Sequence, residues 1–503
     1  MRVIHLCFQL HQPFGLRGTV DGGEDHNYFD TKSAFTKANA EIYQPLFAFL
    51  ERNTQKFAGF RFSLLVSGSW LDLAEQYDTE LIERLRKLVK LGQVELVAEP
   101  ISHSLAFFYD EAELTEQVQR YRARIQKLFG VEGRIFALPE LIYNDQIGKW
   151  AEDFGFAGML VGGSPEVLGW HSPNHIYEAM ECRYLRLLFR NTPLSLAIMH
   201  ADADLLVEKR VSEDSEEKKM VLSAQKFQKR LELDMLRGNL VNLYFDAELF
   251  RVQRDKGVIG LFDELVATWL GVQGNHFVGA AQACVVETPS MALSVKKSVS
   301  WREESDDSYE DKNSQDTVAL VLQAEADVHP PRWLDQPWQV EQSKALYGLK
   351  REILASEDEK LIADWRRLTA LDYALKHDVN SLEVFKKILA DLKVRAEVVK
   401  KAQVVEISRA FTKKRDRGNV DVKTDTSATA VKVNFGVARV GGTTSHAVHT
   451  TAVQSEAEVP VRRLCVREVE PVAEEESGQV VVQKKSKDKP RGIRKVIRKL
   501  VIE

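Results

Sequence analysis

The sequence predicts an α/β protein: a parallel β-sheet with helices outside it, followed by an α-helical bundle and a tail of low order. Three observations predict this. Short apolar runs alternate with amphipathic segments through the first half of the chain, and only helical patterns follow from about residue 331. From about residue 403 the helical period fades, and Lys, Val, Thr and Ser become frequent.

Six apolar runs in the first half are predicted to be buried strands. They lie at residues 3–10, 60–69, 94–99, 134–141, 158–163 and 240–245. Helical segments such as 80–92 and 113–130 separate them, and in the second of these apolar residues recur at intervals of three and four: Leu114, Val118, Tyr121, Ile125 and Leu128. This order of strand and helix is typical of a parallel sheet, either a barrel or an open sheet.

Helical periodicity alone marks the segments 338–355, 357–377 and 381–401, which predict a bundle packed on the sheet. The expected boundaries are 1–300 for the sheet unit, 301–332 for an acidic insertion, 333–402 for the bundle and 403–503 for a largely disordered tail. Two charged stretches, 211–219 and 302–316, are expected to be solvated loops.

Composition excludes several classes of function. The chain has 503 residues, more than the roughly 250 to 300 that one core supports, so more than one structural unit is expected. A net charge of -5 gives no general attraction to nucleic acid, and a neutral substrate fits better. No apolar run reaches the roughly 18 residues of a membrane span. The first residues lack the features of a secretory signal, and four scattered cysteines suggest reduced thiols in a cytoplasm, without a metal or cofactor. The oligomeric state is not indicated.

Polar residues follow four of the predicted strands. His11 ends the first, Glu99 and His103 follow another, and Glu140 and Asp246 each end an apolar run. Active sites of parallel barrels lie at the carboxyl ends of strands, so these side chains are the candidates for chemistry. Taken singly, a carboxylate at a strand end is also explained as a helix cap or a surface residue.

Glu140 and Asp246 form a pair with the requirements of glycosidic bond hydrolysis. That reaction needs one carboxylate that attacks or activates water and one protonated acid that releases the leaving oxygen. Each residue follows an apolar strand, where a dry environment separates the pKa values of two carboxyls. Three tryptophans are candidates to stack on a sugar ring, with core packing as an equal alternative: Trp70, Trp170 and Trp301.

The order of four short motifs resembles a known family. HQP at 11–13, GQVEL at 92–96 with a following His, PE at 139–140 and FDAE at 245–248 are similar to the ordered regions of glycoside hydrolase family 57. Further segments resemble its α-amylase-type branch: FSLLVSGSW at 62–70, LIYND at 141–145, VLGWHSPNHIY at 167–177, SW at 300–301 and WLDQPWQVEQSKALYGL at 333–349. The resemblance covers about residues 1–380.

The resemblance implies an incomplete (β/α)7 barrel followed by a helical bundle, and retaining hydrolysis of the α-glucosidic bonds of starch- or glycogen-like α-glucans. By this resemblance, Glu140 matches the position of the family's nucleophile and Asp246 that of its general acid/base. It also implies a sugar subsite with no metal or cofactor, lined by His11, Glu99, His103 and Trp301.

Two places depart from the pattern of the α-amylase-type branch. After FDAELF a Gly, an acid and a His are replaced by Arg251, Val252 and Gln253, and the Asp-His pair of the last helical motif is replaced by Leu371 and Asp372. Each lost hydrogen bond to substrate costs roughly 1 to 3 kcal/mol. One alternative is a 4-α-glucanotransferase or glucan branching enzyme of the family, since FDAELF also resembles the branching-enzyme motif. The other is an inactive glucan-binding homologue. A zinc-dependent deacetylase, which needs an Asp and two His clustered as zinc ligands, is disfavoured.

Overall fold

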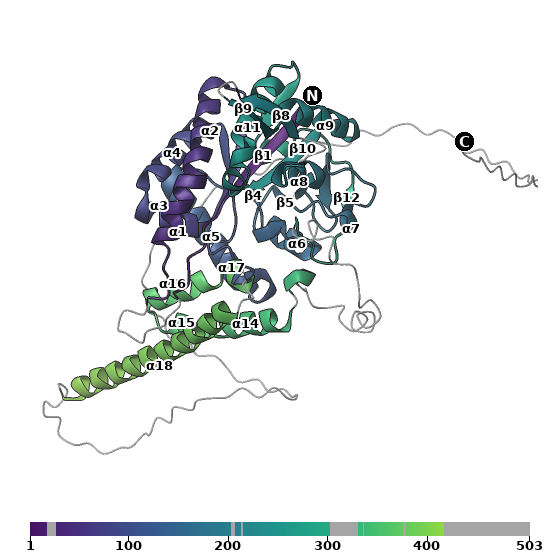
Figure 1. Ribbon diagram of the computed structural model, residues 1–503. Helices are drawn as coiled ribbons and strands as arrows, with labels where there is room; N and C mark the ends of the chain where they lie inside the picture. Colours follow the sequence, from purple (N-terminus) through teal and green to yellow (C-terminus); the bar gives the residue numbers. More distant parts are fainter. Residues whose placement is uncertain are drawn as a thin grey trace, which may run out of the picture. The chain divides into compact units, whose positions relative to one another are not determined.

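The computed structural model describes residues 1–17, 27–202, 207–212, 215–301, 330–334, 336–375 and 379–416 (Figure 1). These residues belong to one compact unit, Met1–Val422. Residues 302–329, most of the predicted acidic insertion, and residues 417–503, most of the predicted tail, lie outside the described residues. Among the residues that the structure describes, none of the helices combines the length and apolar character needed to span a bilayer.

Seven of the described strands form an incomplete barrel, and every ladder between them is parallel. Their order is β10 (Leu240–Asp246), β1 (Arg2–Leu10), β2 (Phe62–Val66), β3 (Val94–Val97), β4 (Ile135–Phe136), β5 (Gly158–Val161) and β7 (Arg186–Phe189). The bridge between Ala98 and Phe136 joins β3 to β4. At the other side, the segment after β7 meets β10 through a hydrogen bond of 2.8 Å from Asn191 N to Asn242 O. The expected incomplete (β/α)7 barrel is confirmed.

Side chains alternate across the barrel wall. In β1, Ile4, Leu6 and Phe8 pack outward in the largest apolar cluster, whereas Val3 and Cys7 belong to a separate cluster. The second cluster also holds buried residues from the other barrel strands, so it is the interior of the barrel. The inward positions at the carboxyl ends of the strands are where polar side chains appear.

The helices that cover the barrel lie between its strands in sequence or follow the last of them, β10. They are α1 (Lys32–Ala38), α2 (Gln44–Lys56), α3 (Gly68–Tyr77), α4 (Thr79–Lys90), α5 (Glu111–Phe129), α6 (Asp145–Asp153), α7 (Pro165–Leu168), α8 (Thr192–Met199), α9 (Ala224–Asp234), α10 (Leu249–Val252), α11 (Val258–Leu270) and α12 (Ala280–Ala283). Shorter turns are the π-helical η1 (Asn39–Tyr43) and the 3-10 segments η2 (Ala106–Phe108), η3 (Pro139–Leu141), η4 (Met235–Arg237), η5 (Arg254–Lys256) and η7 (Arg332–Leu334).

Five further described strands extend or flank the barrel. β6 (Ile176–Ala179) runs antiparallel to β7, β12 (Ala292–Leu293) pairs with β6, and β11 (Asn275–Val278) pairs with the first residues of β1. A separate antiparallel hairpin joins β8 (Val207–Ser212) and β9 (Ser215–Leu222). The expectation that 211–219 is only a loop is therefore wrong. The ladder is made by the backbone, so a run of charged residues does not prevent it.

The helical bundle, drawn in green in Figure 1, has an apolar cluster of its own that includes Ile353, Trp365 and Ile388. Its helices are α14 (Pro337–Gly348), α15 (Lys350–Ala355), α16 (Glu359–Leu368), α17 (Leu371–Ala374) and α18 (Val379–Asp416). α18 continues past the predicted boundary at residue 402.

The predicted helix 357–377 is interrupted, and the interruption has a tertiary cause. Ala370 has an extended ψ of 137° and forms a β-bridge with Ser104 of the barrel unit. The next amide, Leu371 N, donates to His103 O at 2.9 Å. Because these backbone groups bond to the barrel, the helix stops after Leu368, and α17 starts in a new direction.

Candidate active site

The carboxyl ends of β1, β3, β4 and β10 bring the predicted polar residues into one cluster. The imidazole rings of His11 and His103 stack with their centroids 3.9 Å apart. Asp246 lies within the electrostatic influence of Glu140 and of both histidines. The residues Glu140 and Asp246 are half-buried, although the Glu140 Oε2 atom is itself buried.

His103 carries a positive charge at neutral pH because of the carboxylate beneath it. Glu99 is fully buried, and its Oε2 accepts a bond from His103 Nδ1 at 2.8 Å. Burial by itself lowers the pKa of His103, but the charge and hydrogen bond of Glu99, with smaller effects of Asp372 and Glu140, raise it to about 9. The bond to Glu99 therefore fixes the buried His103 ring in one orientation.

Asp372 is part of this cluster, although it is one of the departures from the family pattern. Its Oδ2 lies 2.9 Å from His11 Nε2, and Ser69 Oγ lies 3.4 Å from the other ring nitrogen. Although burial opposes ionisation, His11 and His103 hold the pKa of Asp372 well below its usual range. The helical bundle therefore supplies a permanent anion to the barrel site, and only Leu371 is turned into the core.

Asp246 has the opposite electrostatic character. It ends β10 beside Gln9 of β1, and its Oδ1 accepts a bond from Glu248 N at 2.7 Å. Burial raises the pKa of Asp246 to about 7, with His11 opposing and Glu140 reinforcing the shift. A carboxyl with that pKa is protonated in a large fraction of molecules near neutral pH, as a general acid requires.

Glu140 sits on an unusual backbone. It has a φ of 59° in η3, and its neighbour Leu141 has a φ of 52°. His103 also has a φ of 52°, so three of the five described non-glycine residues with positive φ lie at this cluster. Such a conformation costs about 1 to 3 kcal/mol per residue and persists where the surroundings enforce it, which is common at functional sites.

Two further barrel residues join the cluster and were not predicted. Gln9 Nε2 lies 3.4 Å from His103 Nε2, and the Tyr244 hydroxyl donates to Gln9 Oε1. Both residues occupy inward positions at the ends of strands that the sequence analysis had recognised. The alternation within β1 contained the signal, because Gln9 shares the inward face with Val3 and Cys7.

The three candidate tryptophans have different surroundings. Trp70 is fully buried and stacks on Phe47 in the core, so it is not available to a ligand. Trp170 is 80% exposed. Trp301 packs at the barrel interior, where the Arg190 guanidinium lies 4.8 Å from its ring centre. Its buried indole N–H has no hydrogen-bond partner among the described residues.

The departures after FDAELF lie beside the cluster. Arg251 pairs with the Glu248 carboxylate, Val252 is exposed, and Gln253 is buried and donates to Met199 O at 2.6 Å. Nowhere in the described ranges do three His, Cys, Asp or Glu side chains stand in an arrangement that holds a metal ion.

Comparison with known proteins gives one family. A family model described as "Glycosyl hydrolase family 57" matches residues 5–267, more than half of the 503 residues. A curated protein of Methanocaldococcus jannaschii named "Putative alpha-amylase" is 30% identical over 200 residues, which are 38% of this chain and 42% of that protein. The match thus spans less than half of this relative.

Solved structures share the fold at low identity. The 4-alpha-glucanotransferase from Thermococcus litoralis aligns with a TM-score of 0.56 and 14% identity over 79% of this chain and 59% of that one. The alpha-amylase AmyC from Thermotoga maritima aligns with a TM-score of 0.54 and 13% identity, over 80% of this chain and 94% of that one. The GH57-type branching enzyme from Pyrococcus horikoshii aligns with a TM-score of 0.54 and 14% identity, over 78% of this chain and 88% of that one. These likenesses concern the fold.

Proposed function

The chain belongs to glycoside hydrolase family 57, and from this premise we propose that it is a retaining glycoside hydrolase, α-amylase-like, that cleaves α-glucosidic bonds of starch- or glycogen-like glucans. The observation that carries the proposal is the pair at the strand ends. Asp246, with a pKa raised to about 7 by burial, lies within the electrostatic influence of a second carboxylate, Glu140. An acid and a second carboxylate close to it are what two-step glycoside hydrolysis needs.

In the proposed reaction, Asp246 protonates the interglycosidic oxygen while a Glu140 oxygen attacks the anomeric carbon. The bond to the leaving sugar breaks and a glycosyl-enzyme forms on Glu140. Asp246 is then ionised, takes a proton from water, and the resulting nucleophile releases the sugar with its original anomeric configuration.

The remaining residues are assigned to binding and charge stabilisation. The positive charge that develops on the sugar ring is stabilised by the fixed anion of Asp372. We assign His11 and His103 to bonds with sugar hydroxyls that replace their long 3.4 Å contacts with Ser69 and Gln9. Glu99 fixes the orientation of the His103 ring. The free indole N–H of Trp301 supports a contact to a sugar oxygen.

The test compares purified wild type, Glu140→Gln and the control Glu166→Gln, which changes an exposed carboxylate on α7. Each is incubated with soluble starch and maltooligosaccharides, and products are separated by chain length and anomeric form. Wild type and the control are expected to release shorter chains as α-anomers, and Glu140→Gln none. Products longer than the substrate would indicate glucan transfer or branching instead. Binding of maltooligosaccharide without turnover by wild type would indicate an inactive homologue.

A cytoplasmic location is part of the same proposal. Cys7, Cys182 and Cys284 are free thiols in the structure, which fits a reducing compartment. Localisation of a tagged full-length chain by fractionation of cells tests it, and recovery outside the cytoplasm would contradict it.

A further inference from the structure

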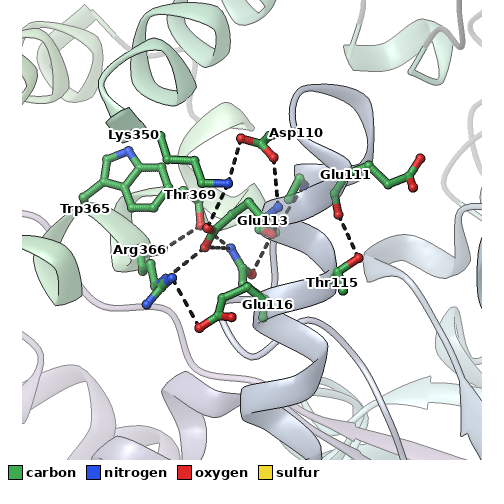
Figure 2. A network of polar contacts seen from close by, with 12 residues as sticks. Asp110, Glu111, Glu113, Thr115, Glu116, Lys350, Trp365, Arg366 and Thr369 are labelled. Carbon is green, nitrogen blue, oxygen red and sulfur yellow. Dashed lines mark hydrogen bonds and ion pairs between the residues drawn. The ribbon is translucent and has the colours of Figure 1, made fainter. Parts of the chain in front are cut away.

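A second charged cluster lies outside the site, where α5 of the barrel meets α15 and α16 of the bundle (Figure 2). Glu113, in the first turn of α5, is fully buried. Its Oε1 accepts a bond from Arg366 Nε at 2.9 Å, and its Oε2 lies 3.5 Å from Lys350 Nζ. One buried carboxylate thus binds a cation from each of two bundle helices.

The surrounding contacts balance the charges. Lys350 Nζ also donates to Asp110 Oδ2 at 2.8 Å, and Asp110 caps α5 by accepting from Glu113 N at 2.9 Å. At the more exposed side, Arg366 lies 3.8 Å from Glu116. Two cations therefore face two buried or half-buried anions, with Glu116 as an outer partner. Removing one member leaves the others uncompensated in a dry interface.

A chain of hydrogen bonds connects this cluster to the active site. Gln117 donates to Glu113 Oε1 at 3.2 Å and lies 3.4 Å from Thr369 Oγ1, and its own Oε1 accepts from Ser104 Oγ at 2.8 Å. Ser104 forms the β-bridge with Ala370. These contacts end one residue from His103 on the barrel side and two residues from Asp372 on the bundle side.

We propose that Glu113, together with Lys350 and Arg366, positions the active site: it fixes the bundle on α5 so that the Asp372 carboxylate reaches His11. The inference rests on the proposed function for its catalytic meaning. Asp372 stands on a helix of only four residues, so its position depends on how the flanking segment is docked. A displacement of about 1 Å at a reacting site costs on the order of 100-fold in rate.

The chemistry of the cluster argues for positioning more than for adhesion. The bundle already has an apolar core, and apolar contacts hold two surfaces together without fixing one orientation. A buried ion pair gains little net stability because of its desolvation cost, but its bonds are directional. Glu113 holds Arg366 through a directional bond and Lys350 through a longer ion pair of 3.5 Å, and Lys350 is itself bonded to Asp110, so the cluster selects one docking geometry.

The test uses the full-length chain and two independent readouts. The variants are Glu113→Gln, Lys350→Met and Asp372→Asn. The matched control is Glu152→Gln, since Glu152 is also a buried carboxylate but accepts from Arg183 N and Tyr184 N, away from the site. One readout is kcat and KM on soluble starch. The other is the NMR titration of His103 in chains that carry ¹³C-labelled histidine. The charged and titratable groups that face the His103 ring are Glu99, Asp372, Glu140, Asp246 and His11.

Glu113→Gln and Lys350→Met are expected to lower kcat/KM by about tenfold to 100-fold. They should also shift the His103 titration downward, in the same direction as Asp372→Asn and by less, because Asp372 helps to raise the pKa of His103. Lys350→Arg should restore both readouts, and Glu152→Gln should leave both unchanged.

The proposal is overturned if Glu113→Gln only lowers the melting temperature while the folded protein keeps wild-type kinetics and the wild-type His103 titration. If Glu113→Gln does not fold, Lys350→Met decides, because that side chain is 18% exposed and its loss disturbs the interior less. If wild type turns over no α-glucan, the proposed function fails, whereas the His103 titration still decides whether Glu113 positions Asp372.

Discussion

The candidate active site joins two regions that are built in different ways. The barrel presents Asp246 as the last residue of β10 and Glu140 in the turn after β4, and the Ala98–Phe136 bridge joins the two sheets to which these strands belong. The bundle contributes a single carboxylate, Asp372, on a helix of four residues that docks through one β-bridge and a buried charge cluster. The groups proposed to react lie on the rigid region, and a group that tunes them comes from the docked one.

The two aspartates also differ in charge state, although both approach the same histidines. Burial raises the pKa of Asp246 to about 7. His11 and His103 hold the pKa of Asp372 well below its usual range. One aspartate is therefore suited to exchange a proton at neutral pH and the other to remain an anion, a division of roles that arises when neighbouring carboxyls have different environments.

The largest effect is expected for Glu140→Gln on the barrel side. Without a nucleophile no glycosyl-enzyme forms, and kcat on starch should fall by about 10⁴-fold or more. The melting temperature should change little, since Glu140 is partly exposed. Steady-state kinetics alongside thermal unfolding check this. A variant that retains a tenth of the activity would remove Glu140 from the role of nucleophile.

Asp246→Asn should lower kcat on starch by about 10²- to 10⁴-fold, because an amide cannot protonate the leaving oxygen. With maltosyl fluoride the loss in kcat/KM should be much smaller than with starch, since fluoride departs without a proton and kcat/KM reports only the steps up to the glycosyl-enzyme. Comparing the two substrates at one pH separates acid catalysis from binding. An equal loss with both substrates would contradict the assignment of Asp246 as the acid.

The pH dependence follows from the same residue. Activity on starch should fall as pH rises through about 7, because Asp246 is then ionised before the substrate binds. The effect on folding has the same direction: with its pKa raised from 3.8, Asp246 contributes stability below about pH 3.8 that is lost as pH rises through about 7. Profiles of kcat/KM and of unfolding by denaturant measure the two. If the residual activity of Asp246→Asn still falls as pH rises through about 7, the fall is caused by the ionisation of another group and not of Asp246.

On the bundle side, Asp372→Asn should lower kcat/KM by roughly 5- to 150-fold, the equivalent of about 1 to 3 kcal/mol for one lost charged partner. It should also change acid stability. Because the folded-state pKa of Asp372 is depressed, its ionised form stabilises the fold above the usual value of 3.8, and this contribution is lost as pH falls below it. Unfolding free energies at neutral and acid pH measure the difference, and a constant gap between variant and wild type would contradict it.

The barrel half of this comparison is the half that the sequence predicted. Apolar runs that end in His11, Glu99, Glu140 and Asp246 give both the strands and the face on which those residues meet. Gln9 was missed because it stands inside an apolar run, where only the alternation of the strand shows its direction. The backbone strain at Glu140 leaves no mark in composition at all.

The bundle half could not be predicted from local pattern. Residues 357–377 have a helical period throughout, so nothing in the segment marks the stop at Leu368. The stop depends on Ser104, more than 250 residues earlier in the sequence, and on the hydrogen bond to His103 O. Asp372 was consequently counted as a loss from the family pattern, although the break is what brings it to His11.

The smallest effect is expected at the edge of the barrel site, where Arg251 departs from the family pattern. Arg251 pairs with Glu248, and both side chains are nearly half exposed, so the pair is worth at most about 1 kcal/mol. Arg251→Ala frees the Glu248 carboxylate for sugar hydroxyls, and KM for maltooligosaccharides should fall by up to about fivefold with kcat nearly unchanged. Arg254→Ala, a second exposed arginine in the following turn, is the control. If Arg251→Ala instead raises KM while the control does not, the arginine itself contacts the substrate, and the departure from the pattern is a gain of a binding group.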